Sequence, residues 1–177
     1  MGEPVQAPQA SSANRVIYVG DLKNGAAQPI ILALMGFDME SHNPIRVIVN
    51  SYGGFIDEMF AIYDVMKACE SPIATIGVGK IMSAGVLLLA AGQEGERRIA
   101  RNALVMLHEL SSATWGKLFA IEADVEQMRR DQKRMMSALA MECRCTLTQV
   151  RDILETHRDT YLTAAEAKAF GIVDKVI

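Results

Sequence analysis

The feature that most restricts the fold is a buried strand that passes directly into an apolar helix. Residues 73–78 form a short apolar run rich in β-branched side chains, which is typical of a buried strand. Residues 84–91 are small or aliphatic, and no charge follows until Glu94, so we expect a helix buried on most sides. The turn between them, residues 79–85, contains two glycines and one hydroxyl group, that of Ser83.

Ser83 lies where this helix should begin. Free backbone N–H groups and the positive end of the helix dipole can stabilise an oxyanion at such a position. Serine is also a preferred helix cap, and this stretch alone favours the capping role. A phosphate-binding P-loop is excluded because Lys80 is followed by Ile81, where that motif requires Ser or Thr.

Two further strand–helix units precede this one. We expect a strand at residues 15–21, then a helix opened by Pro29 that runs through residues 30–35. A β-branched strand at residues 44–50 leads into a second helix, whose apolar positions between residues 55 and 66 cover one face. The repeated order of strand and helix predicts an α/β fold with parallel strands joined by right-handed crossovers.

Two glycine-bearing loops follow these strands, at residues 50–54 and 79–85. Because the carboxyl ends of parallel strands meet at one edge of a sheet, we expect both loops where open α/β sheets bind ligands. Gly53-Gly54 alone is typical of a turn, but also of a backbone that approaches a substrate and directs an N–H at it. Two such donors would converge on one carbonyl oxygen.

Length and charge narrow the class of protein. The chain has 177 residues, is 50% hydrophobic and carries a net charge of -3, which fits one compact domain. Without a basic stripe for a phosphate backbone, we expect no nucleic-acid partner. No apolar run reaches the roughly 18 residues that span a bilayer, and the N-terminus lacks a signal-peptide pattern. We therefore expect no membrane partner and a cytoplasmic location.

The N-terminal segment and the cysteines add two expectations. Residues 1–14 are rich in Pro, Gln, Ala and Ser, so we expect them to be flexible or removed, with a single domain at residues 15–177. The three cysteines, Cys69, Cys143 and Cys145, are odd in number and lack zinc-ligand spacing. Buried free thiols are favoured over disulfides or a metal site.

The second half of the chain contains a short strand and a long helix. Polar residues 93–98 turn the chain, and residues 104–107 predict a buried strand that ends in His108. A lone histidine at a strand end is more often structural than a general base. Residues 115–143 predict a helix too long to lie against one small domain, so we expect part of it to pack on another subunit. Its methionines indicate core or interface filling rather than a cofactor site.

The C-terminal part contains a loop carboxylate and a capped helix. After a short helix to Glu155, Asp159 occupies a loop where a solvated turn residue is the default interpretation. Residues 163–166 form a capping box for a helix ended by Gly171, and residues 172–173 predict a closing strand. His42 lies in a polar linker and is assigned no role.

With Ser83, His108 and Asp159 in view, the sequence resembles the ClpP family, the serine peptidase subunits of the Clp protease. The resemblance covers about residues 15–177, nearly the whole chain. It rests on motifs in the family's order: residues 50–54 (Asn-Ser-Tyr-Gly-Gly), 61–66 (Ala-Ile-Tyr-Asp-Val-Met), 82–85 (Met-Ser-Ala-Gly), 106–108 (Met-Leu-His), 158–159 (Arg-Asp), 162–167 (Leu-Thr-Ala-Ala-Glu-Ala) and 170–174 (Phe-Gly-Ile-Val-Asp).

The resemblance implies a role for each matching residue. Ser83 would be the nucleophile, His108 the general base and then acid, and Asp159 the group that orients the imidazole. The backbone N–H groups of Gly54 and Ala84 would form the oxyanion hole. Because the amide does this work, Ala84 in place of the family's methionine changes little.

The resemblance also implies the fold, the assembly and the partners. The fold would be the spiral of repeated β-α-β units common to ClpP and the crotonases, with a protruding long helix. Two stacked heptameric rings, a homo-tetradecamer, would enclose the sites and cleave polypeptide substrates without a cofactor or metal. No phosphate loop occurs in the chain, so unfolding would require a Clp-type hexameric ATPase in trans.

Several residues depart from the family's pattern. Tyr52 stands where the family has proline, and Glu109-Leu110 stands in place of Gln-Pro. Residues 111–114 replace a glycine-rich strand that lines the substrate groove and helps to join the rings. Arg46 and Ile48 occupy positions where relatives carry surface aromatic residues that receive the ATPase.

Three alternative functions fit a chain of this kind. Crotonase-like acyl-CoA enzymes share the fold and a pair of backbone donors but lack the serine nucleophile, so a complete Ser/His/Asp set argues against them. A capsid-maturation protease, as in a phage, would use the same fold and triad. A catalytically silent ring subunit or scaffold would keep the fold without the activity.

Overall fold

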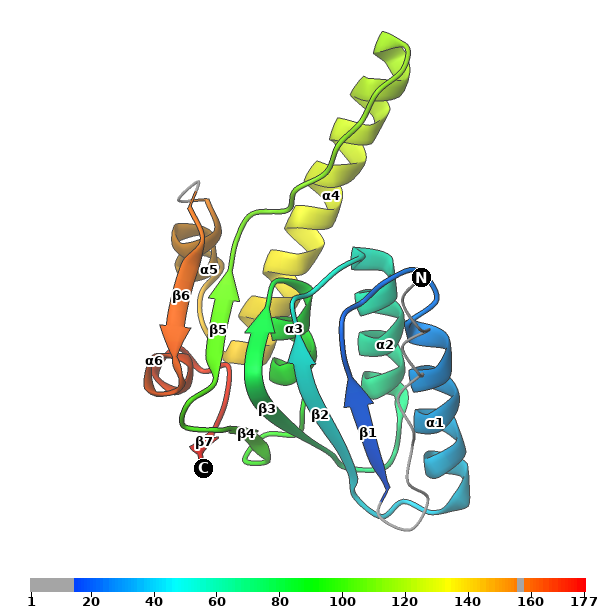
Figure 1. Cartoon of the computed structure of the whole chain (residues 1–177), viewed down its shortest axis with the longest axis vertical. Helices are drawn as coiled ribbons and strands as arrows, with labels where there is room; N and C mark the ends of the chain where they lie inside the picture. The colour runs from blue at the N-terminus through cyan, green and yellow to red at the C-terminus, as the bar shows by residue number, and fades with distance from the viewer. Residues whose placement is uncertain (1–14, 156–157) are drawn as a thin grey trace, which may run out of the picture.

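The computed structural model of the chain describes residues 15–155 and 158–177 (Figure 1). The segment predicted to be flexible or processed, residues 1–14, lies outside the described residues. The described elements are, in order, β1 (Val16–Val19), α1 (Ala27–Glu40), β2 (Ile45–Ser51), α2 (Ile56–Ala68), β3 (Ile73–Met82), α3 (Ala84–Ala90), β4 (Arg97–Ile99), β5 (Leu104–Leu107), α4 (Leu118–Cys143), α5 (Leu147–Leu154), β6 (Thr160–Thr163), α6 (Ala164–Phe170) and β7 (Lys175–Val176).

The strands form a sheet dominated by parallel pairs, which confirms the predicted α/β class. Its main path is β1-β2-β3-β4-β7, and β5 pairs with β3 on one side and with β6 on the other. The pairs along the main path and β3–β5 are parallel, whereas β5–β6 is antiparallel. In Figure 1 the arrows of β1, β2, β3 and β5 point the same way, toward the side of the molecule from which α4 protrudes.

β3 is longer than the sequence predicts. The expected strand ended at residue 78, but β3 continues to Met82 because its last three residues pair with β5. Its first half pairs with β4 instead. Gly79 has a φ of 64°, which lets the strand change direction between its two partners. Residues 80–82 are therefore strand rather than turn, and Ser83 is the first residue beyond it.

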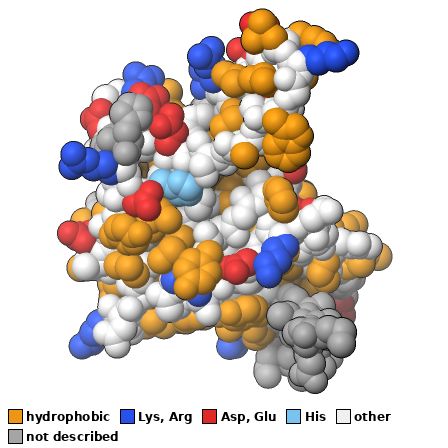
Figure 2. Space-filling model, turned by 45° about the horizontal axis from the view of Figure 1, so that its top comes forward, with side chains coloured by type: hydrophobic (Ala, Val, Ile, Leu, Met, Phe, Trp, Pro, Cys, Tyr) orange, Lys and Arg blue, Asp and Glu red, His pale blue; other side chains and the backbone are white. Residues whose placement is uncertain are grey.

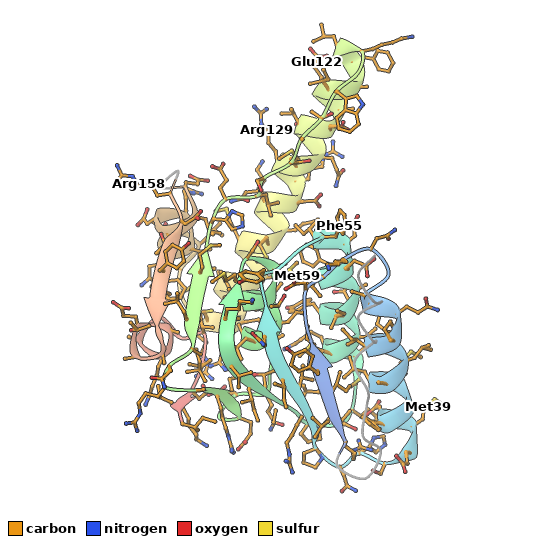
Figure 3. All side chains as sticks on the ribbon, in the orientation of Figure 1. Met39, Phe55, Met59, Glu122, Arg129 and Arg158 are labelled. Atoms are coloured by element: carbon orange, nitrogen blue, oxygen red, sulfur yellow. The ribbon has the colours of Figure 1, made fainter. Side chains whose placement is uncertain are left out.

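Helix α2 packs against both α1 and α3; α1 also contacts β1, and α3 contacts β2, β3 and β5. All seven residues of α3 are buried, which confirms the expected apolar helix. Helix α2 buries the predicted residues Met59, Ile62, Tyr63 and Met66. Phe55 was expected on the same face but is 61% exposed, because it precedes the first helical residue and points away from the core (Figure 3).

Helix α4 has a packed root and an exposed arm. The root buries a stripe in the core: Met135, Met136, Ala138, Leu139 and Cys143. We call residues 115–130 the arm: the short segment before α4 and the first half of the helix. The arm protrudes beyond the sheet and carries Glu122 and Arg129 (Figure 3). Hydrophobic side chains gather on it (Figure 2), and Trp115, Leu118 and Phe119 near its tip are at least 70% exposed. The sequence placed the helix start at residue 115, three residues before the observed one.

At the C-terminal end the helix boundaries are confirmed and the last strand is not. Thr163 and Glu166 form the predicted capping box, and Gly171, with a φ of 95°, ends α6. The apolar pair Ile172 and Val173 was predicted as a strand but packs into the core instead, and the closing strand is β7.

A buried arginine explains why β4 was missed. The expected polar turn at residues 93–98 contains Arg97, which is only 5% exposed. Arg97 forms a 2.6 Å ion pair with Asp174 and donates to the carbonyl oxygens of Glu142 and Gly171. Hydrogen bonds from Arg97 lower the pKa of Asp174 to about 2. The ion pair holds β4 beside β7 and allows a charged residue to start a buried strand.

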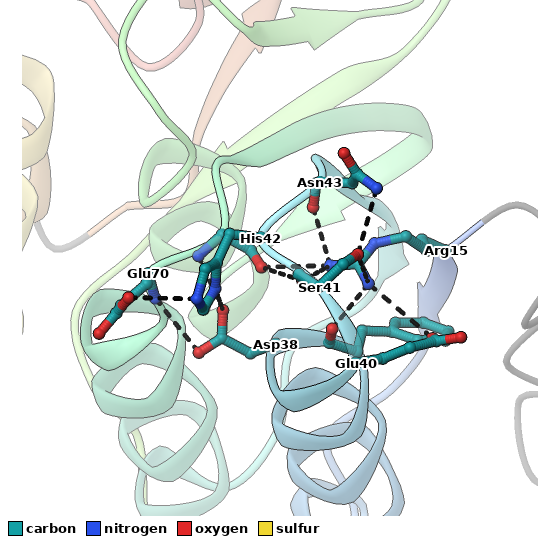
Figure 4. Close-up of polar contacts among 9 residues, drawn as sticks. Arg15, Asp38, Glu40, Ser41, His42, Asn43 and Glu70 are labelled. Atoms are coloured by element: carbon teal, nitrogen blue, oxygen red, sulfur yellow. Dashed lines mark hydrogen bonds and ion pairs between the residues drawn. The ribbon is translucent and has the colours of Figure 1, made fainter.

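A second polar network lies at the amino ends of the parallel strands (Figure 4), and we call it the amino edge. It consists of Arg15, Asp38, Ser41, His42, Asn43, Glu70 and Ser71. The Arg15 guanidinium donates to five oxygens across 2.6 to 3.1 Å, those of the Phe37, Ser41 and Asn43 carbonyls and of the Ser41 and Ser71 hydroxyls. His42, to which the sequence gave no role, lies 3.5 Å from Asp38 and 3.3 Å from Glu70.

The remaining expectations concern thiols, metals and membranes. The three cysteines are free; Cys143 is buried, whereas Cys69 and Cys145 are only half-buried. Burial raises the pKa of the Cys143 thiol to about 12. The described part of the chain contains no cluster of side chains suited to hold a metal ion. Among its helices, none combines the length and the apolarity needed to cross a bilayer.

Candidate active site

Ser83 and His108 meet at the carboxyl edge of the sheet, which we define as Gly54, Ser83, Ala84 and His108. Ser83 follows β3 and His108 follows β5, and these strands are parallel neighbours. The Ser83 N–H donates to the Met106 carbonyl across 2.8 Å, which fixes the end of β3 against β5. His108 Nε2 lies 2.8 Å from Ser83 Oγ, within hydrogen-bonding distance.

The backbone of Ser83 is strained. Its φ of 54° and ψ of -124° lie outside the regions that residues with a Cβ normally adopt. Such strain persists only where the surrounding structure enforces it, and a sharp turn from strand to helix is how nucleophilic serines are presented in several hydrolases. The Ser83 side chain makes no capping hydrogen bond to α3. The capping interpretation is therefore wrong, and the hydroxyl group faces His108 instead.

The pairing of β5 with β6 brings Asp159 close to His108, but the two side chains are not hydrogen-bonded among the described residues. β5 and β6 are antiparallel with Leu107 opposite Thr160, so one further step sets His108 opposite Asp159. Residues directly opposite in such a pair have Cα atoms about 4.5 to 5.5 Å apart. Asp159 is exposed, and within residues 15–155 and 158–177 no hydrogen bond joins it to His108.

The two glycine-bearing loops converge on Ser83, as the sequence predicted. A Cβ atom on Gly53 would lie 2.7 Å from the Cβ of Ser83 and 3.1 Å from the Ala84 nitrogen. Gly53 and Gly54 have φ values of 94° and 142°, and a side chain on Gly54 would collide with the Leu22 carbonyl. Only glycine fits at both positions, and Gly53 packs directly against the turn that contains Ser83.

Two backbone amides beside Ser83 have no acceptor among the described residues. The Gly53 N–H is occupied, because it donates to Ser51 Oγ across 2.9 Å. The next amide, that of Gly54, and the amide of Ala84 at the first turn of α3 make no such bond within the described residues. These are the two amides that the sequence analysis assigned to an oxyanion hole.

A groove begins directly after His108. It has a volume of about 670 Å³ and lies between Glu109, Leu110, the middle of α4 and α5. Its apolar lining comes from Leu110, Val125, Met128, Met136 and Leu147, and charged side chains of both signs stand around it. Gln132 accepts the Leu110 N–H across 3.0 Å, which ties the segment after His108 to α4.

Sequence analysis missed two residues that support this site. Ser51 is fully buried and accepts the Gly53 N–H. Asp21, which follows β1, accepts the Tyr52 N–H across 2.8 Å. A serine or aspartate next to a glycine turn is a recognised signal of side chain to backbone bonding, but the partner of Asp21 is 31 residues away.

Together these features define a class of protein. A strained serine paired with a histidine at the carboxyl edge of a parallel sheet, beside two amides that have no acceptor among the described residues, is the arrangement of an α/β serine hydrolase. A family model described as Clp protease matches residues 7–177. The chain belongs to the Clp protease family and is a serine peptidase of the ClpP type. This membership favours a peptidase over a crotonase-like acyl-CoA enzyme.

Proposed function

We propose that the protein is a serine endopeptidase that cleaves short or unfolded polypeptides inside an oligomeric chamber. The observation that carries the proposal is the 2.8 Å contact between His108 Nε2 and Ser83 Oγ at a strained turn. The catalytic residues are Ser83, His108 and Asp159, within one peptidase domain at residues 15–177.

In the proposed reaction, Ser83 Oγ attacks the scissile carbonyl carbon while His108 Nε2 takes the hydroxyl proton. His108 then gives this proton to the leaving amine, and water releases the acyl group from Ser83 by the same steps in reverse order. Asp159 accepts a hydrogen bond from Nδ1 and stabilises the imidazolium. This last role needs the Asp159 side chain to turn toward His108, the residue opposite it in register.

The oxyanion that forms in the first step would accept hydrogen bonds from the Gly54 and Ala84 amides. Support comes from the absence of other acceptors for both amides among the described residues. Donors fixed before the reaction need no reorganisation, and one of them is worth about 10²- to 10³-fold in kcat. The groove after His108 offers an apolar surface for a substrate side chain beside the scissile bond.

The proposed assembly is two stacked heptameric rings joined through the α4 arms. The arm exposes Trp115, Leu118 and Phe119, a hydrophobic cluster that one small domain leaves uncovered. Light scattering should give a tetradecamer for the wild type and smaller species for Phe119→Ser. A stable wild-type monomer at micromolar concentration would contradict this, and a lone heptamer would implicate residues 111–114.

The proposal includes a Clp-type hexameric ATPase as partner, in the cytoplasm. The chain has no phosphate loop, and a folded substrate is stabilised by roughly 5 to 15 kcal/mol that something else must supply. The test is degradation of a tagged, folded reporter with and without the ATPase and ATP, beside a short fluorogenic peptide. We expect the peptide to be cleaved in both cases and the reporter only with the ATPase. Rapid cleavage of the folded reporter by the chain alone would overturn the enclosed chamber and favour a capsid-maturation type of protease.

A further inference from the structure

Tyr52 is held from two sides, directly before the glycine pair of the proposed oxyanion hole. Its backbone N–H donates to Asp21 Oδ1 across 2.8 Å. Its ring lies under the Lys80 ammonium group, with 3.1 Å between Nζ and the ring centroid. Both Tyr52 and Asp21 are exposed, so neither contributes to the core. The contacts join the segment after β1, the loop after β2 and the second half of β3.

The segment after β1 continues along the same loop. The Leu22 N–H donates to the Gly53 carbonyl and the Phe55 N–H donates to the Leu22 carbonyl, each across 2.8 Å. Leu22 is fully buried, so this part of the segment is anchored in the core. These two bonds and the bond from the Tyr52 N–H to Asp21 make three hydrogen bonds that hold residues 52–55 against the segment after β1. The Gly54 amide lies within the stretch that they hold.

These ties matter because the loop has little stiffness of its own. Gly53 and Gly54 adopt φ values of 94° and 142°, and glycine has more conformational freedom than any other residue. An amide acts as an oxyanion donor only if it is aimed before the reaction begins. Whatever restrains the peptide planes on either side of Gly53 therefore restrains the Gly54 N–H.

We propose that Asp21 is a positioning residue for the oxyanion hole. By accepting the Tyr52 N–H, its carboxylate fixes the start of the glycine pair and holds the Gly54 N–H toward Ser83. Asp21 acts through Tyr52 and touches neither the substrate nor the reacting atoms. The inference rests on the proposed peptidase function and adds a residue to it.

The first test compares three variants by steady-state hydrolysis of a fluorogenic peptide. In Asp21→Ala the acceptor is lost, and we expect kcat to fall about tenfold with KM unchanged, because one hydrogen bond is lost from transition-state positioning only. Asp21→Asn retains an acceptor oxygen and should stay within about twofold of the wild type. Asp57→Ala, which removes an exposed carboxylate just beyond the loop, is the matched control and should leave kcat and melting temperature unchanged.

A double-mutant cycle isolates the role of the Tyr52 N–H. Proline at position 52 has no N–H to donate, so Asp21→Ala should have no further effect on kcat in a Tyr52→Pro background. A purely structural role of Asp21 would instead lower the melting temperature and leave kcat per folded enzyme unchanged.

The outcomes separate this inference from the proposed function. Unchanged kcat in Asp21→Ala, or an equal loss in both backgrounds, would overturn the positioning role while Ser83-dependent hydrolysis of the wild type still stood. Wild-type hydrolysis that persists in Ser83→Ala would overturn the peptidase assignment and the positioning role together. If Asp21→Ala fails to fold, the same decision rests on Tyr52→Pro alone, which removes the donated N–H and should lower kcat with KM unchanged; a wild-type kcat in Tyr52→Pro would overturn the positioning role.

Discussion

At the amino edge of the sheet, charged side chains are held by one another. Arg15 donates to five oxygens, and His42 lies between two carboxylates. Strain and unused donors at this edge are confined to Arg15, which has a φ of 47° and a buried Nε without a partner among the described residues. At the carboxyl edge they surround a serine and a histidine that face each other. Ser83 has a strained backbone, His108 faces a hydroxyl group, and two amides have no acceptor among the described residues.

The contrast indicates what each edge is for. Satisfied hydrogen bonds and ion pairs stabilise a fold, whereas strain and unused donors lower stability and persist at functional sites. The same residue types, serine and histidine, occur at both edges. Their neighbours, rather than their identities, separate a structural histidine from a candidate base.

The largest expected difference comes from matched serine substitutions. Ser83→Ala should lower peptide turnover by roughly 10,000-fold or more with little change in stability, because the nucleophile is lost and a small side chain is removed. Ser71→Ala at the amino edge should leave kcat unchanged but lower the free energy of unfolding by about 1 to 2 kcal/mol, since its hydroxyl is buried and bonded to Arg15. Turnover and chemical denaturation of both variants give the comparison, and equal effects on kcat would contradict it.

The next effect is on stability alone. Arg15→Ala should lower the free energy of unfolding by roughly 2 to 4 kcal/mol, because it leaves carbonyl oxygens without their donor. Peptide turnover per folded molecule should be retained. Urea denaturation followed by an activity assay on the folded fraction checks both points. A loss of kcat without a loss of stability would mean that Arg15 affects catalysis at Ser83 and His108, and would contradict a purely structural role of the amino edge.

A smaller effect is the contribution of Asp38 to stability, which should depend on pH. Hydrogen bonds from the Ser71 hydroxyl and backbone lower the pKa of Asp38 from 3.8 to about 2. A carboxyl group with a lowered pKa in the folded state stabilises that state above pH 4. This contribution is lost as the pH falls toward 2. The difference in melting temperature between wild type and Asp38→Asn should therefore shrink over this range, and a constant difference would refute the assignment.

The smallest effect is expected at the second histidine. The His42 side chain is 61% exposed, and ion pairs at such a position contribute little. His42→Ala should shift the melting temperature by less than about 3 °C and leave kcat unchanged. His108→Ala should abolish most turnover with a similarly small thermal shift. A loss of activity in His42→Ala would remove the distinction between the two edges.

Local patterns in the sequence were enough to predict the elements that local forces determine. The Thr163 capping box, the Gly171 helix end and the buried α3 depend on residues a few positions apart. The approach of Gly53 to Ser83 was predictable because both follow parallel strands, whose carboxyl ends meet at one edge.

The features that sequence reasoning missed depend on distant partners. β3 extends past Gly79 because β5, more than 20 residues further on, pairs with its end. Arg97 can be buried because it forms an ion pair with Asp174, which lies 77 positions away in the chain. Asp21 accepts the N–H of Tyr52, which is 31 positions further along the chain, and Ser83 contacts Met106 and His108, both more than 20 positions further on. No pattern within a short window carries these contacts.

The most direct measurement of the central claim is covalent labelling with a fluorophosphonate, followed by mass spectrometry of the modified peptide. Such reagents react with a serine that a neighbouring base activates beside an oxyanion hole. We predict about one label per chain, located on Ser83, with labelling lost in Ser83→Ala and slowed at least roughly 100-fold in His108→Ala. A label on any other serine, or equal labelling of wild type and Ser83→Ala, would contradict the assignment of Ser83 as the nucleophile.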